Sequence, residues 1–138
     1  MIAFDTNALV RMLVEDDAAQ ARTIKNIVSY IEDHSDRIIV PSEVLIETVW
    51  VLESVYHCTR AEVCNFLETL VRTATFAFED PVVIRTAVSQ YNQGGDFADL
   101  VIVNKAKRLK AKQLISFDKK LQKIFPGYVV ESVKIHES

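Results

Sequence analysis

Acidic side chains recur at four points of this sequence, at spacings that could bring them to one place. Asp5 directly follows a short apolar run at the N-terminus. The later acidic residues are Glu43 and Glu47, then Asp96 and Asp99, then Asp118. Carboxylates within a few ångströms repel one another, and one or more is protonated at neutral pH unless a cation joins them. All-oxygen sites of this kind suit Mg²⁺ or Mn²⁺ rather than Zn²⁺.

A carboxylate-bound pair of such ions has a characteristic chemistry. Two ions roughly 3.5–4 Å apart can clamp an in-line displacement at phosphorus, and one of them lowers the pKa of the attacking water. Hydrolysis of a phosphodiester is the reaction that follows from this arrangement. The acidic residues therefore indicate phosphoryl chemistry if the fold brings them together.

Each acidic residue also has a simpler explanation. Asp5, Asp96 and Asp118 stand where helix N-caps are common, and Glu43 suits the first turn of a helix because of the macrodipole. Asp96 is as well explained by capping as by a site role. Glu47 lies at the edge of an apolar stripe, where burial is costly without a partner. For the set as a whole, shared chemistry is the better explanation.

Short apolar runs and helical patterns alternate along the chain and must position these side chains. We expect strands near 2–4, 38–40, 76–78, 114–115 and 128–130. Helices are expected near 8–14, 17–33, 43–56, from 59 onward, and near 81–92, 96–110 and 118–124. Thr6 and Asn7 are candidate caps of the first helix, Ser42 of the third, and Thr59 to Glu62 reads as a capping box. The alternation predicts an α/β fold in three layers, with a central parallel sheet of four to five short strands.

Composition limits the remaining possibilities. With 138 residues, 49% of them apolar and 25% charged, the chain is expected to form a single domain over 1–138. It shows no transmembrane run and no signal peptide, so we expect a cytoplasmic protein that does not bind membranes. Cys58 and Cys64 match no zinc or redox spacing, and the histidines suggest no nucleophilic triad.

The charge distribution bears on nucleic-acid binding. The net charge of -3 argues against bulk electrostatic attraction to nucleic acid. However, Lys105, Lys107, Arg108 and Lys110 form part of a basic cluster near the third acidic point. Such a cluster is either a solvated helix end or a rim that binds phosphates.

Four short motifs, taken in order, resemble those of PIN-domain nucleases. The motifs are Phe4-Asp5-Thr6-Asn7, Pro41-Ser42-Glu43-Val44-Leu45-Ile46-Glu47, Asp96-Phe97-Ala98-Asp99 and Ser116-Phe117-Asp118. Their intervals and the chain length resemble the VapC-type toxins of type II toxin–antitoxin systems. The resemblance covers essentially the whole chain. Ser116 stands where threonine is more usual, and the hydroxyl is kept.

The resemblance implies an endoribonuclease that depends on a divalent metal, Mg²⁺ or Mn²⁺, and acts on RNA. The implied catalytic and metal-binding residues are Asp5, Glu47, Asp99 and Asp118, with Asp96 as an accessory carboxylate and Asn7 and Ser116 as supporting hydrogen-bonding residues. It also implies a homodimer and a cognate VapB-like antitoxin that inserts a basic segment into the acidic groove.

Three competing classes remain open at this point. A haloacid-dehalogenase-like phosphatase would carry a second aspartate two residues after Asp5, where this chain has Asn7. A receiver-type signalling domain would bring paired acids after its first strand. A PIN-fold module that binds RNA or protein without catalysis would bind metal without cutting RNA.

Overall fold

The computed structural model describes residues 1–133, in which short strands alternate with helices. In chain order the elements are β1 (Ile2–Ala3), α1 (Thr6–Leu13), α2 (Ala18–Asp33), β2 (Ile38–Val40), α3 (Ser42–Ser54), α4 (Arg60–Arg72), β3 (Phe76–Phe78), α5 (Pro81–Tyr91), α6 (Phe97–Arg108), β4 (Leu114–Ile115), α7 (Lys119–Ile124) and β5 (Val129–Val130). Every expected strand and helix is present, with ends shifted by a few residues. None of the described helices is both long and apolar enough to cross a bilayer.

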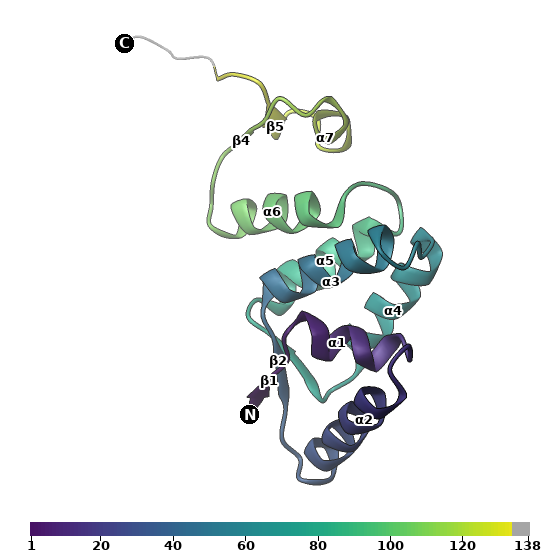
Figure 1. Ribbon diagram of the computed structural model, residues 1–138. Helices are drawn as coiled ribbons and strands as arrows, with labels where there is room; N and C mark the ends of the chain where they lie inside the picture. The colour runs from purple at the N-terminus through teal and green to yellow at the C-terminus, as the bar shows by residue number, and fades with distance from the viewer. Residues whose placement is uncertain (134–138) are drawn as a thin grey trace.

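The strands are parallel and lie in two separate sheets. In the first sheet β2 is central, with β1 on one side and β3 on the other. In the second sheet β4 pairs with β5. Figure 1 places these sheets toward opposite ends of the molecule, with α6 between them. The α/β class with parallel pairing is confirmed, but the single central sheet of four to five strands is divided, because a strand pattern does not specify which edges meet.

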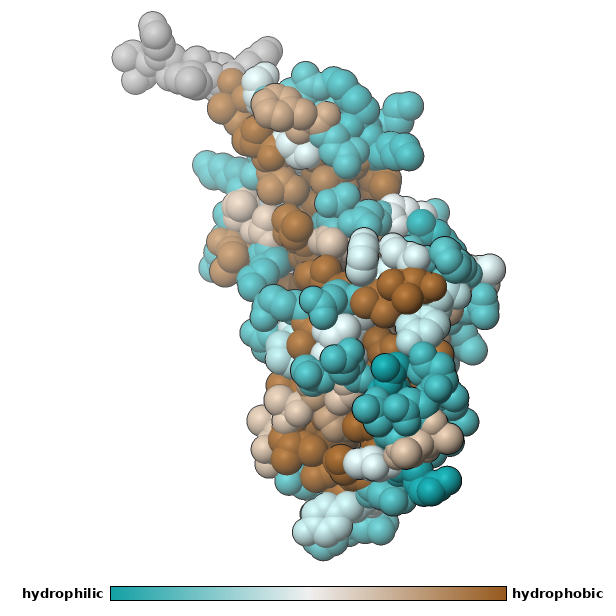
Figure 2. Space-filling model, viewed as in Figure 1, coloured by the Kyte–Doolittle hydropathy of each residue, from teal (hydrophilic) through white to brown (hydrophobic). Residues whose placement is uncertain are grey.

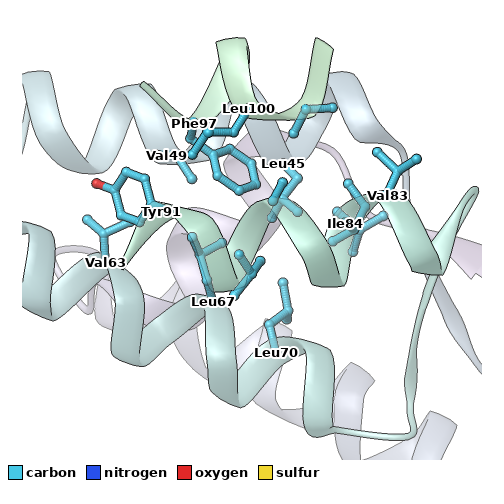
Figure 3. Close-up of a cluster of buried hydrophobic side chains, with 14 of the residues drawn as sticks. Leu45, Val49, Val63, Leu67, Leu70, Val83, Ile84, Tyr91, Phe97 and Leu100 are labelled. Carbon is cyan, nitrogen blue, oxygen red and sulfur yellow. The ribbon is translucent and has the colours of Figure 1, made fainter. Parts of the chain in front are cut away.

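The core consists mainly of helix faces packed against one another. Leu45 of α3, Leu67 of α4, Ile84 of α5 and Leu100 of α6 are all fully buried, and Figure 3 shows them converging in one cluster. The Tyr91 and Phe97 rings extend this cluster by packing edge to face, with centroids 5.9 Å apart. The short segment between α5 and α6 is therefore anchored at both ends by buried aromatic rings.

Helix starts follow local capping rules, with two differences from expectation. Asp5, rather than Thr6 or Asn7, caps α1 by accepting a hydrogen bond from the Ala8 N–H at 2.9 Å. Ser42 is the first residue of α3 and not its cap, and its N–H donates to a Glu79 carboxylate oxygen at 2.9 Å. In each case a neighbouring carboxylate satisfies a free N–H of the first turn.

The turn before α6 depends on two glycines. Gly94 and Gly95 have φ angles of +130° and +101°, which side chains of L-residues rarely tolerate. A Cβ at Gly95 would also lie 3.2 Å from the Cδ1 atom of Ile124. This turn brings Asp96 to the N-cap of α6 and holds it close to α7.

Truncation of a core side chain shared by these helices tests the packing. We expect Leu67→Ala to lower the free energy of unfolding by about 2–5 kcal/mol, because it leaves a cavity among α4 and its neighbours. Val82→Ala, at a residue that is 54% exposed, is the matched control and should change it by less than about 0.5 kcal/mol. Urea unfolding followed by circular dichroism measures both, and equal losses would contradict the packing described.

Candidate active site

The first group of acidic residues lies at the carboxyl ends of β1 and β2. Asp5, Glu43 and Glu47 line a pocket of about 250 Å³ together with Asn7. Glu43 and Glu47 are four residues apart on α3, so they share a face of that helix. The Oδ1 atom of Asp5 accepts the Ala8 N–H, while its Oδ2 atom accepts no hydrogen bond from the described residues. One carboxylate oxygen of Asp5 therefore remains available to a ligand.

The second group lies where α6 meets α7. Asp96, Asp99 and Asp118 line a pocket of about 340 Å³. Asp96 caps α6 by accepting the Asp99 N–H at 3.1 Å. Asp118 caps α7, and its Oδ1 atom accepts from two backbone N–H groups at 2.9 and 3.1 Å. As at Asp5, capping uses one oxygen of each side chain and leaves the other.

The electrostatics of the second group show that its members are close neighbours. Burial raises the pKa of the Asp99 carboxyl, and the negative charges of Asp96 and then Asp118 raise it further. Clustered carboxylates of this kind are stabilised by a cation. Their oxygens are the ligands that Mg²⁺ and Mn²⁺ prefer.

The two acidic groups line separate pockets in the described part of the chain. A groove of about 710 Å³ connects them, and it is lined by Glu43 and Glu47 from the first pocket and by Asp96 from the second. Within residues 1–133, however, no three His, Cys, Asp or Glu side chains are arranged to hold one metal ion. The donor atoms suit a divalent ion, and the described residues divide them between two pockets, because β1 and β4 end in different sheets.

The two expected supporting residues have different surroundings. Ser116 precedes α7, and its hydroxyl oxygen accepts a hydrogen bond from the Asp118 N–H at 3.1 Å. The Ser116 carbonyl accepts from the Gln122 side chain at 2.8 Å, which fixes the turn that carries Asp118. Asn7 lines the pocket beside Asp5, where its side chain makes no hydrogen bond within the described part of the chain.

The expected phosphate rim lies away from the carboxylates. Lys105, Lys107, Arg108 and Lys110 are all exposed at or just beyond the carboxyl end of α6, whereas Asp99 lies in its first turn. Nine residues of helix separate Asp99 from Arg108 by about 14 Å along the axis. Arg108 pairs with Asp80 at 3.2 Å, and the Lys107 ammonium lies 4.9 Å from the centroid of the Tyr128 ring. Two members of the cluster thus already have partners within the protein.

Two cations stand closer to the second acidic group. Arg60 and Lys120 line its pocket. The Arg60 guanidinium donates to the carbonyls of Tyr91 and Gly95 at 2.9 and 2.8 Å, and it lies 4.4 Å over the Tyr91 ring. The sequence marks Arg60 only as the residue after a helix cap, so its position at the site depends on tertiary structure. Lys120 belongs to the basic cluster seen in the sequence.

The raised pKa of Asp99 predicts a pH-dependent stability difference. A carboxyl whose pKa is higher in the folded state than in the unfolded state does not lower the free energy of unfolding at a pH where it is protonated in both states. It destabilises the fold increasingly as pH rises through the window between the two pKa values. We therefore expect Asp99→Asn to be more stable than the wild type near pH 7, with the gain shrinking toward about pH 3.

Urea unfolding across that pH range measures the difference. Asp17→Asn is the control, because Asp17 caps α2 by accepting the Gln20 N–H and lies outside both pockets. A stability difference for Asp99→Asn that stays constant with pH would contradict the assigned electrostatics.

Comparison with known proteins places these features in a family. A family model described as PIN domain matches residues 2–125. A curated relative from Aquifex aeolicus (strain VF5), described as VapC ribonuclease, is 29% identical over 125 residues, which span 90% of this chain and 92% of the relative. No solved structure matches the chain. The match extends from β1 through α7 and includes both acidic groups, and we conclude that this chain belongs to the PIN-domain family.

Proposed function

We propose that this protein is an endoribonuclease that hydrolyses RNA phosphodiester bonds with the help of a divalent metal ion, Mg²⁺ or Mn²⁺. The observation that carries the proposal is the similarity to a VapC ribonuclease along 90% of the chain. Two groups of carboxylates joined by one groove give that similarity a chemical basis. Membership of the PIN family removes the dehalogenase-like phosphatase and the receiver domain from consideration.

Within this proposal, five of the six acidic residues have assigned roles. Asp5, Glu47, Asp99 and Asp118 are the catalytic metal ligands, and Asp96 is an accessory carboxylate. The roles of Asp5 and Asp118 are supported by their hydrogen bonds, because capping uses only one oxygen of each carboxylate. The role of Asp99 is supported by its half-buried position beside two other carboxylates.

We further propose that the protein is the toxin of a cytoplasmic toxin–antitoxin pair, neutralised by a VapB-like antitoxin. Support comes from the name of the Aquifex aeolicus relative and from the chemistry of the groove between α3 and α6. Its lining combines the carboxylates of Glu43, Glu47 and Asp96 with the apolar faces of Ile46 and Trp50, the latter 60% exposed. A basic segment with apolar side chains complements such a lining.

A PIN-fold module that binds without catalysis is the second candidate. It is favoured by the capping roles of Asp5, Asp96 and Asp118 and by the separation of the two acidic groups. Binding of metal without RNA cleavage would support this candidate over the nuclease.

Cleavage of a mixed cellular RNA pool tests the activity. We expect cutting by the purified protein with Mg²⁺ or Mn²⁺ and none with EDTA. Asp5→Asn should reduce the rate by on the order of 100-fold or more, since loss of metal-dependent stabilisation costs several kcal/mol. Asparagine caps helices as well as aspartate does, so the variant should stay folded. Asp17→Asn, another capping aspartate, is the matched control and should cut at the wild-type rate.

Two results would contradict this function. One is cutting by Asp5→Asn at the wild-type rate. The other is absence of cutting with either metal, both before and after unfolding and refolding the protein to remove any inhibitor that co-purifies.

The basic cluster on α6 predicts a salt effect on RNA binding. Lys105 and Lys110 are the two members with no ion pair or aromatic contact among the described residues. If both lysines contact phosphates, the double variant Lys105→Gln/Lys110→Gln should bind RNA with a weaker salt dependence. The magnitude of the slope of log K, where K is the association constant, against log salt concentration should fall by about 1.4, which is about 0.7 per contact on single strands. Filter binding by Asp5→Asn protein at several salt concentrations measures the slope. Lys25→Gln on α2 is the control. A slope that the double variant leaves unchanged would show that the cluster is a solvated helix end.

A further inference from the structure

Arg60 is held in the second acidic pocket by hydrogen bonds that use only part of its guanidinium. Its Nη1 atom donates to the carbonyls of Tyr91 and Gly95 at 2.9 and 2.8 Å. Its Nε and Nη2 atoms donate to no described residue. A guanidinium carries five N–H groups in a planar fork, and two of them on one edge can bind a phosphate through parallel hydrogen bonds. Among the described residues, the edge formed by Nε and Nη2 is therefore available to an anion.

The surroundings of Arg60 keep its guanidinium in place. It lies 4.4 Å from the centroid of the Tyr91 ring, which is fully buried and packs edge to face against Phe97. Although Arg60 shares its pocket with the three carboxylates of the second acidic group, it forms no ion pair with a described residue. A cation that is already positioned loses little conformational freedom when it binds an anion.

Lys120 brings a second positive charge to this pocket from α7. A Cβ at Gly95 would lie 3.2 Å from the Cδ1 atom of Ile124, so α7 lies against the same turn that Arg60 holds. Lys120 is exposed, lines the pocket and forms no ion pair with a described residue. Figure 2 shows hydrophilic surface at the end of the molecule where Figure 1 places α7. One cation of the pocket thus comes from α4 and the other from α7.

The placement of these two cations indicates a phosphodiester strand as their ligand. The carboxylates of the pocket would repel an RNA backbone unless positive charges nearby offset them. Among the described residues, Arg60 and Lys120 are the cations that line this pocket, whereas the basic cluster lies at the other end of α6. The function proposed above requires a phosphodiester to reach these carboxylates. An acidic peptide would add negative charge without supplying that bond.

We propose that Arg60 and Lys120 each hold a backbone phosphate of the RNA strand beside the second acidic group. Arg60 binds its phosphate through the edge formed by Nε and Nη2, and Lys120 binds as a single charge. The inference rests on the function proposed above for the identity of the strand as RNA. It assigns substrate binding to a pair of residues that lie far apart in the sequence and outside the four acidic motifs.

Filter binding of a short single-stranded RNA of mixed sequence tests the two contacts. The protein carries Asp5→Asn, so that the RNA stays intact, and the salt concentration is varied. Arg60→Gln and Lys120→Gln should each reduce the magnitude of the slope of log K, where K is the association constant, against log salt concentration by about 0.7, and the double variant by about 1.4. At fixed salt, Arg60→Gln should weaken binding by on the order of 10-fold, because it loses two charge-assisted hydrogen bonds.

The matched controls are Arg72→Gln and Lys119→Gln. Arg60 and Arg72 are the first and last residues of α4 and lie about 18 Å apart along its axis. Lys119 precedes Lys120 and pairs with Glu131. Both controls should leave the slope unchanged. The proposal is overturned if neither pocket variant changes the slope, or if the controls reduce it as much as the pocket variants do.

Urea unfolding of the same variants separates phosphate binding from a purely structural role of Arg60. If Arg60 serves only to hold the turn before α6, Arg60→Gln would lower the free energy of unfolding and leave the slope at its wild-type value, which overturns the proposal. Arg60→Lys keeps the charge and should retain the wild-type slope, because the slope counts charge contacts. If Arg60→Gln does not fold, the slope for Lys120→Gln decides the proposal.

Cleavage by the wild-type protein separates this inference from the proposed function. If the pocket variants lower the slope and the wild-type protein cuts no RNA with either metal, the proposed function fails and the phosphate contacts stand. If the wild-type protein cuts RNA and the slope is the same in all variants, the proposed function stands and the phosphate contacts are refuted.

Discussion

The packing of α6 against α5 is the constraint on which the rest of the structure depends. Burial of Phe97 and Leu100 against the α5 side fixes α6, and the edge-to-face contact of Phe97 with Tyr91 fixes the turn between them. That turn places Asp96 and Asp99 at the start of α6. The chain continues from the end of α6 into the unit of β4, α7 and β5, in which Asp118 caps α7. One apolar interface therefore sets the position of two carboxylates, those of Asp96 and Asp99.

The carboxylates combine a local structural role with an electrostatic one. Asp5, Asp96 and Asp118 each satisfy free N–H groups at a helix start, which orients the side chain and leaves one oxygen outside the capping bonds. Asp99 caps no helix among the described residues, and its charged form is destabilised by burial and by its acidic neighbours. Capping and the proposed metal binding are compatible because they would use different oxygens of the same carboxylate.

The polar framework around Tyr91 connects the second acidic group to the core. The Tyr91 hydroxyl donates to Glu53 at 2.9 Å, and burial followed by this hydrogen bond raises the pKa of the hydroxyl. Arg60 spans the same region by bonding the carbonyls of Tyr91 and Gly95. A cation is thereby held at the rim of a carboxylate pocket, and among the described residues it forms no ion pair with those carboxylates, so the pocket carries charges of both signs.

The sequence by itself determined the elements and their starts. Apolar runs located every strand, helical spacing located every helix, and residues such as Thr59 and Asp118 marked helix starts because capping depends only on a few neighbouring residues. The same local patterns identified the six carboxylates, since a strand end followed by a helix start is a local feature. Tertiary structure alone decided that the five strands form two sheets, that the carboxylates fall into two groups, and that Arg60 lies beside one of them. These outcomes depend on which strand edges and helix faces meet, and such contacts join residues far apart in the chain that no local pattern relates.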